Sequence, residues 1–159
     1  MLEALARLYP DPECALHYRA PWQLLVAVIL SAQCTDKKVN EVTKELFKKY
    51  KTLDDYVNAK PVEFERDIYS TGFYRAKTRN ILAAARAIKE DFGGKVPKTI
   101  GEMLTIPGVG RKTANVVLGE LYGSTEGIAV DTHVIRLSRL LGITKHTDAV
   151  KIERDLMAL

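Results

Sequence analysis

The chain is poor in cysteine: only Cys14 and Cys34 occur among its 159 residues. They stand far apart and form no Cys-x-x-Cys pair, so they can build neither a four-cysteine metal or cluster site nor a disulfide framework. We expect both to be buried free thiols in a reducing compartment. The sequence therefore excludes the small secreted, disulfide-stabilised class of protein.

Long apolar runs are also lacking. The longest, from Leu24 to Leu30, is too short to cross a bilayer. The N-terminus lacks the charged segment, apolar core and small-residue cleavage site of a secretory signal. These absences predict a cytoplasmic, nucleoid-associated protein without a membrane partner.

The excess of positive charge is mild. Lysine and arginine number 24 against 20 acidic residues, which gives a net charge of +4 and a pI of about 9.0. This balance favours an acidic partner such as nucleic acid. The chain is 47% hydrophobic, and its length suits one compact domain or two small lobes around a cleft.

Apolar residues recur with helical spacing nearly throughout, and no segment alternates with period two, so the sequence predicts an all-α fold. The segment after Pro21 is apolar almost all round and reads as a buried central helix. Thr99 and Glu102 have the spacing of a capping box at a helix start. The predicted helices cover 22–32, 36–50, 52–59, 61–72, 73–92, a short segment from 99, about 110–122, 131–141 and 147–159.

The segment 107–110, Pro-Gly-Val-Gly, predicts a tight hairpin between two helices. Gly108 and Gly110 permit positive φ angles and close approach of another backbone. Arg111 and Lys112 then fall in the first turn of the second helix, where the macrodipole disfavours cations. A polyanion would supply the missing charge, with turn N–H groups gripping a phosphate, with or without a bound monovalent cation. A plain helix-to-helix turn is the alternative.

Two nucleotide-binding motifs are disfavoured at this hairpin. A P-loop needs glycine directly before its lysine, where this chain has Arg111. A dinucleotide fingerprint needs a third glycine, where this chain has Thr113, and a preceding strand. The hairpin therefore does not predict an NTP or NAD site.

Lys112 and Asp131 are candidate catalytic residues. A lysine at a helix N-terminus beside a second cation is biased towards the neutral, nucleophilic amine. Asp131 follows an apolar run and is most simply the N-cap of a helix. The alternative is a carboxylate at a cleft, which takes a proton from Lys112 or stabilises a developing sugar cation. Spacing alone does not bring the two side chains together.

The segments 106–118 and 128–133 resemble endonuclease III, a family of helix-hairpin-helix DNA glycosylases whose motif is completed by a Gly/Pro-rich loop and an aspartate. The similarity includes 30–36, 72–77 and 96–97, and so spans essentially the whole chain. It implies an all-α helix-hairpin-helix DNA glycosylase fold with two lobes and an active site in the cleft between them. We expect a helical barrel lobe at 14–124, with its motif at about 99–122, and an incomplete second lobe of 1–13 plus 125–159.

The resemblance implies base excision repair by a monomer acting on double-stranded DNA with a damaged base or an abasic site. Lys112 would attack C1′ of an oxidised pyrimidine nucleotide, displace the base and form a Schiff base, and β-elimination would then nick the strand. Asp131 would activate the lysine and stabilise the sugar cation. The nucleotide must leave the duplex, because C1′ is shielded inside it.

The resemblance also assigns DNA contacts. Gln33 would enter the gap left by the extruded base, and Phe73 would be an apolar wedge against the opposite strand. Gln33 as the end of a buried helix and Phe73 as a core residue are the alternatives. Further DNA contacts fall on Gly108, Val109, Gly110, Arg111, Thr113 and His133, with Ser31 and Asp36 in the substrate pocket.

Several of these positions have ordinary readings as well. His133 could be a satisfied histidine at a helix start, and Asp36 could cap the helix that begins at Lys37. Near Phe73, a phosphate role is open for some of the cations Arg75, Lys77 and Arg79.

The sequence departs from the family at its C-terminus. Members continue into further helices and a four-cysteine loop that holds a [4Fe-4S] cluster, whereas this sequence ends at Leu159, and Cys14 and Cys34 do not match those ligands. We expect a fragment or a shortened member that binds no metal or cluster. An apolar patch near Leu2, Leu5 and Leu8 should then be exposed.

Two other functions remain open. A monofunctional mismatch glycosylase is the first, but those relatives carry another residue where Lys112 stands. A non-catalytic helix-hairpin-helix DNA-binding module is the second, and it would need neither Asp131 nor the segment 31–33.

Overall fold

The computed structural model describes residues 2–10 and 13–159, and every regular element in these two ranges is helical, as predicted. The elements are α1 (Leu2–Leu8), α2 (Pro21–Leu30), α3 (Asp36–Lys49), α4 (Leu53–Val57), α5 (Pro61–Ile68), the 3-10 turn η1 (Tyr69–Thr71), α6 (Tyr74–Asp91), α7 (Ile100–Met103), α8 (Arg111–Tyr122), α9 (Thr132–Leu140) and α10 (Ala149–Met157).

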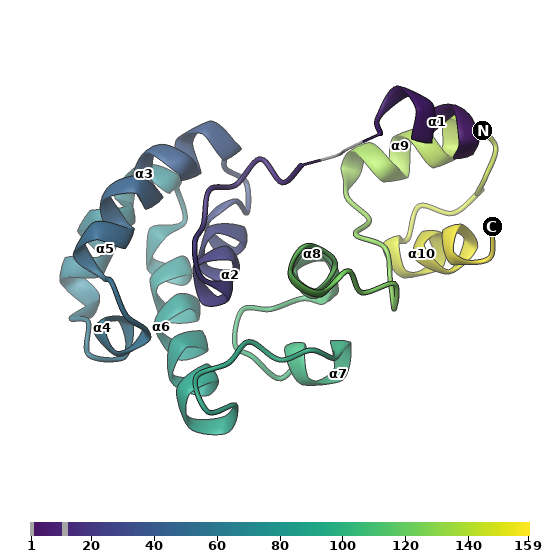
Figure 1. The fold of residues 1–159 in the computed structure, drawn as a ribbon. Helices are drawn as coiled ribbons and strands as arrows, with labels where there is room; N and C mark the ends of the chain where they lie inside the picture. Colours follow the sequence, from purple (N-terminus) through teal and green to yellow (C-terminus); the bar gives the residue numbers. More distant parts are fainter. Residues whose placement is uncertain (1, 11–12) are drawn as a thin grey trace.

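Helix α2 forms the centre of the fold, as its apolar sequence predicts. All residues from Gln23 to Leu30 are buried, and the helix contacts α3, α6 and α8, which surround it (Figure 1). The main hydrophobic core is drawn from residues 16–118. The start of α8, which carries the predicted phosphate-gripping hairpin, is therefore built on a packed support.

The predicted helix starts are largely confirmed. The side chains of Thr52 and Thr99 accept from the backbone N–H three residues on, as N-caps do. Glu102 reaches back to the hydroxyl of Thr99, at 2.8 Å. The last helix is capped by Asp148 and not by Thr147, because Asp148 accepts from Lys151 N–H at 3.0 Å.

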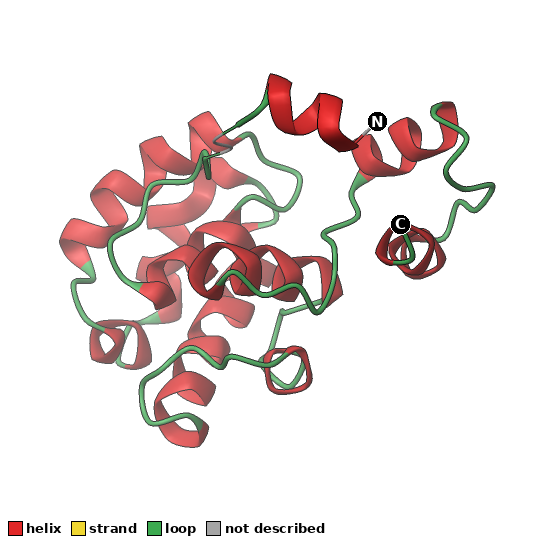
Figure 2. Ribbon diagram, turned by 45° about the vertical axis from the view of Figure 1, so that its right-hand side comes forward, coloured by secondary structure: helices red, strands yellow, loops and turns green. Residues whose placement is uncertain are grey.

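Helices α1, α9 and α10 lie together on one side of the molecule, away from α3 to α6 (Figures 1 and 2). The loop 124–130 leads from α8 to α9. Leu5 and Leu8 are 46% and 71% exposed, which confirms that part of the predicted apolar patch. The side chain of Leu2 lies outside the described residues.

Cys14 and Cys34 are free thiols, as predicted, but both are only half-buried. Among the residues described, no helix is long and apolar enough to cross a membrane. Within the same part of the chain, no cluster of three or more His, Cys, Asp or Glu side chains could hold a metal ion. The two cysteines of the sequence do not fit a four-cysteine [4Fe-4S] cluster.

Candidate active site

Lys112 and Asp131 face one another across the junction of α8 and α9. Lys112 is the second residue of α8, directly after the hairpin, and Asp131 immediately precedes α9. The ammonium nitrogen Nζ of Lys112 lies 4.0 Å from Oδ2 of Asp131. The side chains are 58% and 35% exposed, so an external substrate can reach both. The fold therefore brings together the two residues that spacing alone left apart.

Asp131 is held rigidly by its second role. Its Oδ1 accepts from the N–H groups of His133 and Val134, each at 2.9 Å, which makes it the N-cap of α9. Partial burial acts to raise the pKa of Asp131, but the Val134 N–H, the Lys112 cation and the His133 N–H outweigh burial and hold that pKa below its ordinary value. The carboxylate is thus an anion fixed in place, with Oδ2 aimed at the lysine.

Arg111 has a counter-charge within the chain. Its Nε donates to Oε2 of Glu153 at 2.5 Å. Glu153 lies in α10 and is only 4% exposed, and its other oxygen accepts from Asn115 at 2.8 Å and from Ile128 N–H at 3.2 Å. The expectation that a polyanion alone balances both cations was therefore wrong for Arg111. Its ion pair ties the start of α8 to α10.

Burial acts to raise the pKa of Glu153, but the Arg111 guanidinium and the Asn115 amide outweigh it and lower that pKa. Glu153 is therefore ionised at neutral pH although it is buried. Gly127 packs directly on this cluster, since a Cβ there would collide with Oε1 of Glu153 and would come within 2.6 Å of the Asn115 amide oxygen. Sequence reasoning missed all three residues; the available signal was a polar Asn115 on the apolar face of α8.

The two hairpin glycines differ. Gly108 has φ +79°, and a Cβ on it would lie 2.5 Å from Cβ of Asn80 in α6, so only glycine fits. Gly110 has φ −91° and open space around it, so it does not use the positive φ that glycine permits. Its missing side chain leaves room for another molecule.

Val109 turns inward. Its side chain is 7% exposed and belongs to the core, and its N–H donates to the carbonyl of Ile106 at 3.1 Å. That N–H is therefore used within the hairpin. The first turn of α8 leaves the N–H groups of Arg111, Lys112 and Thr113 without a partner inside the helix.

Gln33 and Phe73 share an unusual backbone. They have φ angles of 52° and 47°, and among the described residues no other non-glycine has a positive φ. Gln33 lies in the turn after α2, and Phe73 is the N-cap of α6. Phe73 is 67% exposed, and Gln33 is exposed as well. The core reading of Phe73 was therefore wrong.

The remaining candidates are placed around these positions. Ser31 is half-buried, and its hydroxyl donates to the carbonyl of Val28 at 2.9 Å. Asp36 is exposed at the start of α3, where the cap is Thr35 and not Asp36. Thr113 is half-buried and His133 is exposed.

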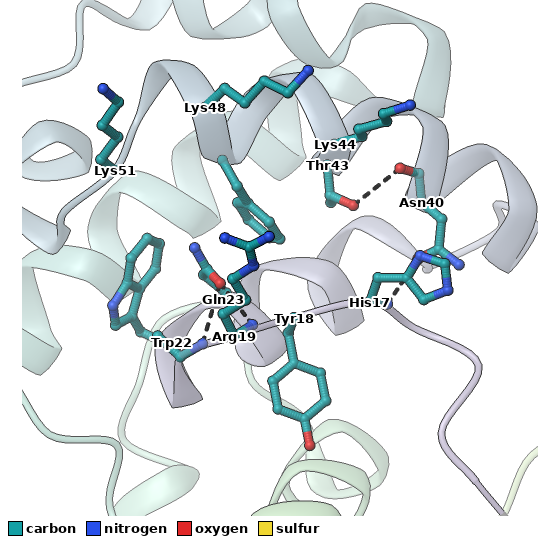
Figure 3. Close-up of a pocket in the computed structure, with 12 residues that line it drawn as sticks. His17, Tyr18, Arg19, Trp22, Gln23, Asn40, Thr43, Lys44, Lys48 and Lys51 are labelled. Atoms are coloured by element: carbon teal, nitrogen blue, oxygen red, sulfur yellow. Dashed lines mark hydrogen bonds between the residues drawn. The ribbon is translucent and has the colours of Figure 1, made fainter.

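A sizeable pocket of the described part of the chain lies away from this site. It has a volume of about 770 Å³ and lies between the N-terminus of α2 and α3, with Arg19, Trp22, Lys44 and Lys48 among its lining residues (Figure 3). None of the predicted site residues lines it. The Lys112–Asp131 pair instead lies open at the surface, which suits a large ligand that covers it.

Comparison with known proteins identifies a superfamily. Residues 26–159 match the HhH-GPD superfamily of base excision DNA repair proteins. Endonuclease III of Synechocystis sp. is 54% identical, over 100% of this chain and 73% of its own length. Endonuclease III of Bacillus subtilis is 48% identical, over 98% of this chain and 71% of its own length.

The solved structure of a trapped endonuclease III–DNA covalent intermediate, an estranged-adenine complex, superposes with a TM-score of 0.92 at 47% identity. It covers 99% of this chain and 74% of that one. The fold, the hairpin and the Lys112–Asp131 pair thus define a helix-hairpin-helix base excision DNA repair protein. Within that superfamily, the chain belongs to the endonuclease III family.

Proposed function

We propose that this chain is a bifunctional DNA glycosylase and abasic-site lyase, with Lys112 as the nucleophile and Asp131 as its electrostatic partner. The observation that carries the proposal is the 4.0 Å separation between Lys112 Nζ and Asp131 Oδ2 at an accessible helix start. A solved relative held covalently on DNA supports the same kind of chemistry.

The reaction begins at C1′ of the damaged nucleotide. The neutral Lys112 amine forms a bond to C1′, and the bond from C1′ to the base breaks, so that the base leaves with the electron pair and takes a proton from the attached amine. The bond from C1′ to O4′ then breaks as O4′ takes a proton from water, which opens the sugar ring and gives the protonated Schiff base between Lys112 and C1′. Transfer of a proton from C2′ to water then expels the 3′ phosphate, which nicks the strand by β-elimination.

The lowered pKa of Asp131 makes it a weak base, which favours the stabilising role over lasting proton storage. A fixed carboxylate beside C1′ stabilises positive charge that develops on the sugar as the base departs. Asp131 accepts from two backbone N–H groups, so its position costs no reorganisation during the reaction.

DNA would lie along the face that carries the hairpin, Gln33 and Phe73. The open space at Gly110 admits a phosphate towards the first turn of α8, and its N–H groups and dipole attract an anion there. A monovalent cation at the hairpin is part of the same proposal. The extruded nucleotide would pass between a barrel lobe of 14–124 and a second lobe of 1–13 plus 125–159, with Ser31 and Asp36 near the pocket.

The proposal places no [4Fe-4S] cluster on this chain, since its two cysteines cannot supply four ligands. We place the enzyme on chromosomal DNA in the cytoplasm. The preferred substrate class is an oxidised pyrimidine.

Borohydride trapping tests the nucleophile. The chain is incubated with a duplex that holds one abasic site, since borohydride reduces a Schiff base to a stable amine. We expect a covalent adduct with the chain that is absent with Lys112→Ala. Lys151→Ala is a matched control, because Lys151 is an exposed lysine of α10 outside the site. No adduct with intact DNA binding would instead indicate a non-catalytic module.

The monofunctional alternative is separated by a second readout. A bifunctional enzyme nicks a duplex that contains thymine glycol without any added alkali. A monofunctional one releases the base, leaves the strand intact and forms no adduct. The presence of Lys112 at the helix start favours the first outcome.

A further inference from the structure

Lys77 is a buried lysine that the proposed chemistry does not use. It lies in the first turns of α6, is 4% exposed, and has no carboxylate within ion-pair distance among the described side chains. A phosphate contact, which the sequence left open for it, is therefore excluded by burial. Burying a lysine without an anion is costly, so its retention in the core calls for a reason.

Its ammonium group bridges two backbone carbonyls that are distant in sequence. Nζ donates to the carbonyl of Thr71 at 2.7 Å and to the carbonyl of Leu30 at 2.8 Å. Leu30 ends α2, where the last carbonyls lack helical partners and the dipole favours a cation. Thr71 ends η1. One side chain thus joins the ends of two separate elements.

Each bridged carbonyl lies two or three residues before a left-handed residue. Gln33 follows Leu30 within one turn, and Phe73 follows Thr71 after Gly72. The left-handed conformation is unfavourable for a non-glycine residue and persists only where the surroundings enforce it. Both strained residues are exposed, so neither is held by packing of its own side chain.

We propose that Lys77 is a positioning residue that fixes the Gln33 and Phe73 turns relative to one another, so that they enter DNA as one unit. This inference rests on the proposed function, in which Gln33 fills the gap and Phe73 wedges the opposite strand. Two side chains on independent loops would each lose conformational freedom on binding DNA, whereas a shared tether removes that entropy cost beforehand. Burial lowers the pKa of Lys77, which agrees with its enclosed position.

The test compares two duplexes that differ in the work of extrusion. One holds thymine glycol, a base that must be unstacked, and the other holds an abasic site with no base to unstack. Lys77→Met removes the donors and keeps the chain length. We expect its rate on thymine glycol to fall by about 100-fold, with a much smaller fall on the abasic duplex. Lys77→Arg, which keeps N–H donors, should recover part of the loss.

Thr78→Val is the matched control. Thr78 is the next residue of α6, is 1% exposed, and its hydroxyl has no hydrogen-bond partner. It therefore alters the same buried region without touching the tether, and the ratio of the two rates should stay unchanged. Equal losses on both duplexes for Lys77→Met would overturn the proposal and leave Lys77 as a structural residue only.

A double-mutant cycle of Gln33 and Phe73, measured with and without Lys77→Met, tests the tether even if Lys77→Met lowers stability. The DNA carries 2-aminopurine opposite an abasic site, where its fluorescence rises on unstacking, and no chemistry is needed. In the wild-type background, the double variant with Gln33→Ala and Phe73→Ala should reduce the rise in fluorescence by less than the product of the two single reductions. In the Lys77→Met background, the reduction in the double variant should equal the product of the two single reductions. Independent losses in both backgrounds would overturn the tether.

The two proposals fail differently. If the wild-type chain unstacks 2-aminopurine but forms no borohydride adduct, the lyase proposal is refuted and the proposal for Lys77 is not. A chain that forms the adduct, but whose Lys77→Met variant keeps the wild-type ratio of rates, refutes the tether alone.

Discussion

Nε of Arg111, the first residue of α8, lies 2.5 Å from Oε2 of Glu153 in α10. This contact joins the hairpin that we assign to phosphate binding to the last helix of the described chain. Glu153 also accepts hydrogen bonds from the Asn115 amide and the Ile128 N–H. A single buried carboxylate therefore connects α8, α10 and the segment that leads to Asp131.

Glu153→Gln should destabilise the chain by about 1.5–3 kcal/mol, the range for a hydrogen bond to a charged group. The amide cannot balance Arg111 or accept at both oxygens. Thermal unfolding measures the effect, and Glu90→Gln, an exposed glutamate of α6, is the control that should not shift. An unchanged midpoint for Glu153→Gln would show that the cluster contributes no stability.

Asp131 combines a helix cap with a charge, and two variants separate these roles. Asp131→Asn keeps a good N-cap, whereas Asp131→Ala loses about 1 kcal/mol of stability. We expect both to lose about 100-fold or more in the rate of nicking. Unfolding and single-turnover kinetics on one duplex measure the two effects. A fully active Asp131→Asn would reduce the residue to a cap.

The two hairpin glycines should respond in opposite ways to alanine. Gly108→Ala places a methyl against Asn80 at a positive φ and should cost about 1–3 kcal/mol of stability. Gly110→Ala should leave stability unchanged but weaken DNA binding, because its methyl enters the space assigned to a phosphate. Binding measured against salt concentration tests the second effect, since loss of one phosphate contact makes the slope shallower.

Acid should weaken the fold through two carboxylates. The folded-state pKa values of Asp131 and Glu153 lie below their ordinary values of 3.8 and 4.5. Groups with depressed values contribute stability above the unfolded pKa and lose it as pH falls through the folded pKa. Stability should therefore decline as pH falls below about 5. The decline should be shallower in Glu153→Gln, as unfolding at a series of pH values will show.

The apolar face of α1 and α9 should bind a hydrophobic dye. Leu8 and Leu140 are 71% and 72% exposed, on helices that lie on the same side of the molecule (Figure 2). Leu8→Ser combined with Leu140→Ser should lower the fluorescence of anilinonaphthalene sulfonate without lowering the unfolding midpoint, since neither side chain is packed. Val62→Ser, which removes an exposed apolar side chain of α5, is the control.

Local patterns in the sequence were enough to predict the helices. Periodicity, Pro21, Pro61 and Thr99 predicted where elements begin, because capping and helical spacing act over only a few residues. The hairpin and the cap at Asp131 followed in the same way. The resemblance to endonuclease III then indicated Lys112 and Asp131 as a pair.

Other features needed the folded chain. The sequence offered Lys77 as one more surface cation, and Gly110 as the equal of Gly108. Burial of the lysine and the contact of Gly108 with Asn80 depend on how α6 lies against α2 and the hairpin. No pattern within one helix records that packing.

The all-α class, the helix starts and the residue types needed for a lysine nucleophile follow from the order of the residues, because they rest on short-range backbone preferences and side-chain chemistry. The folded chain was needed to show that Lys112 meets Asp131, that Arg111 is balanced by Glu153, and that Lys77 joins the turns of Gln33 and Phe73. Each of these relationships links distant parts of the chain, and its distance is set by packing around α2 and α8 rather than by spacing along the chain.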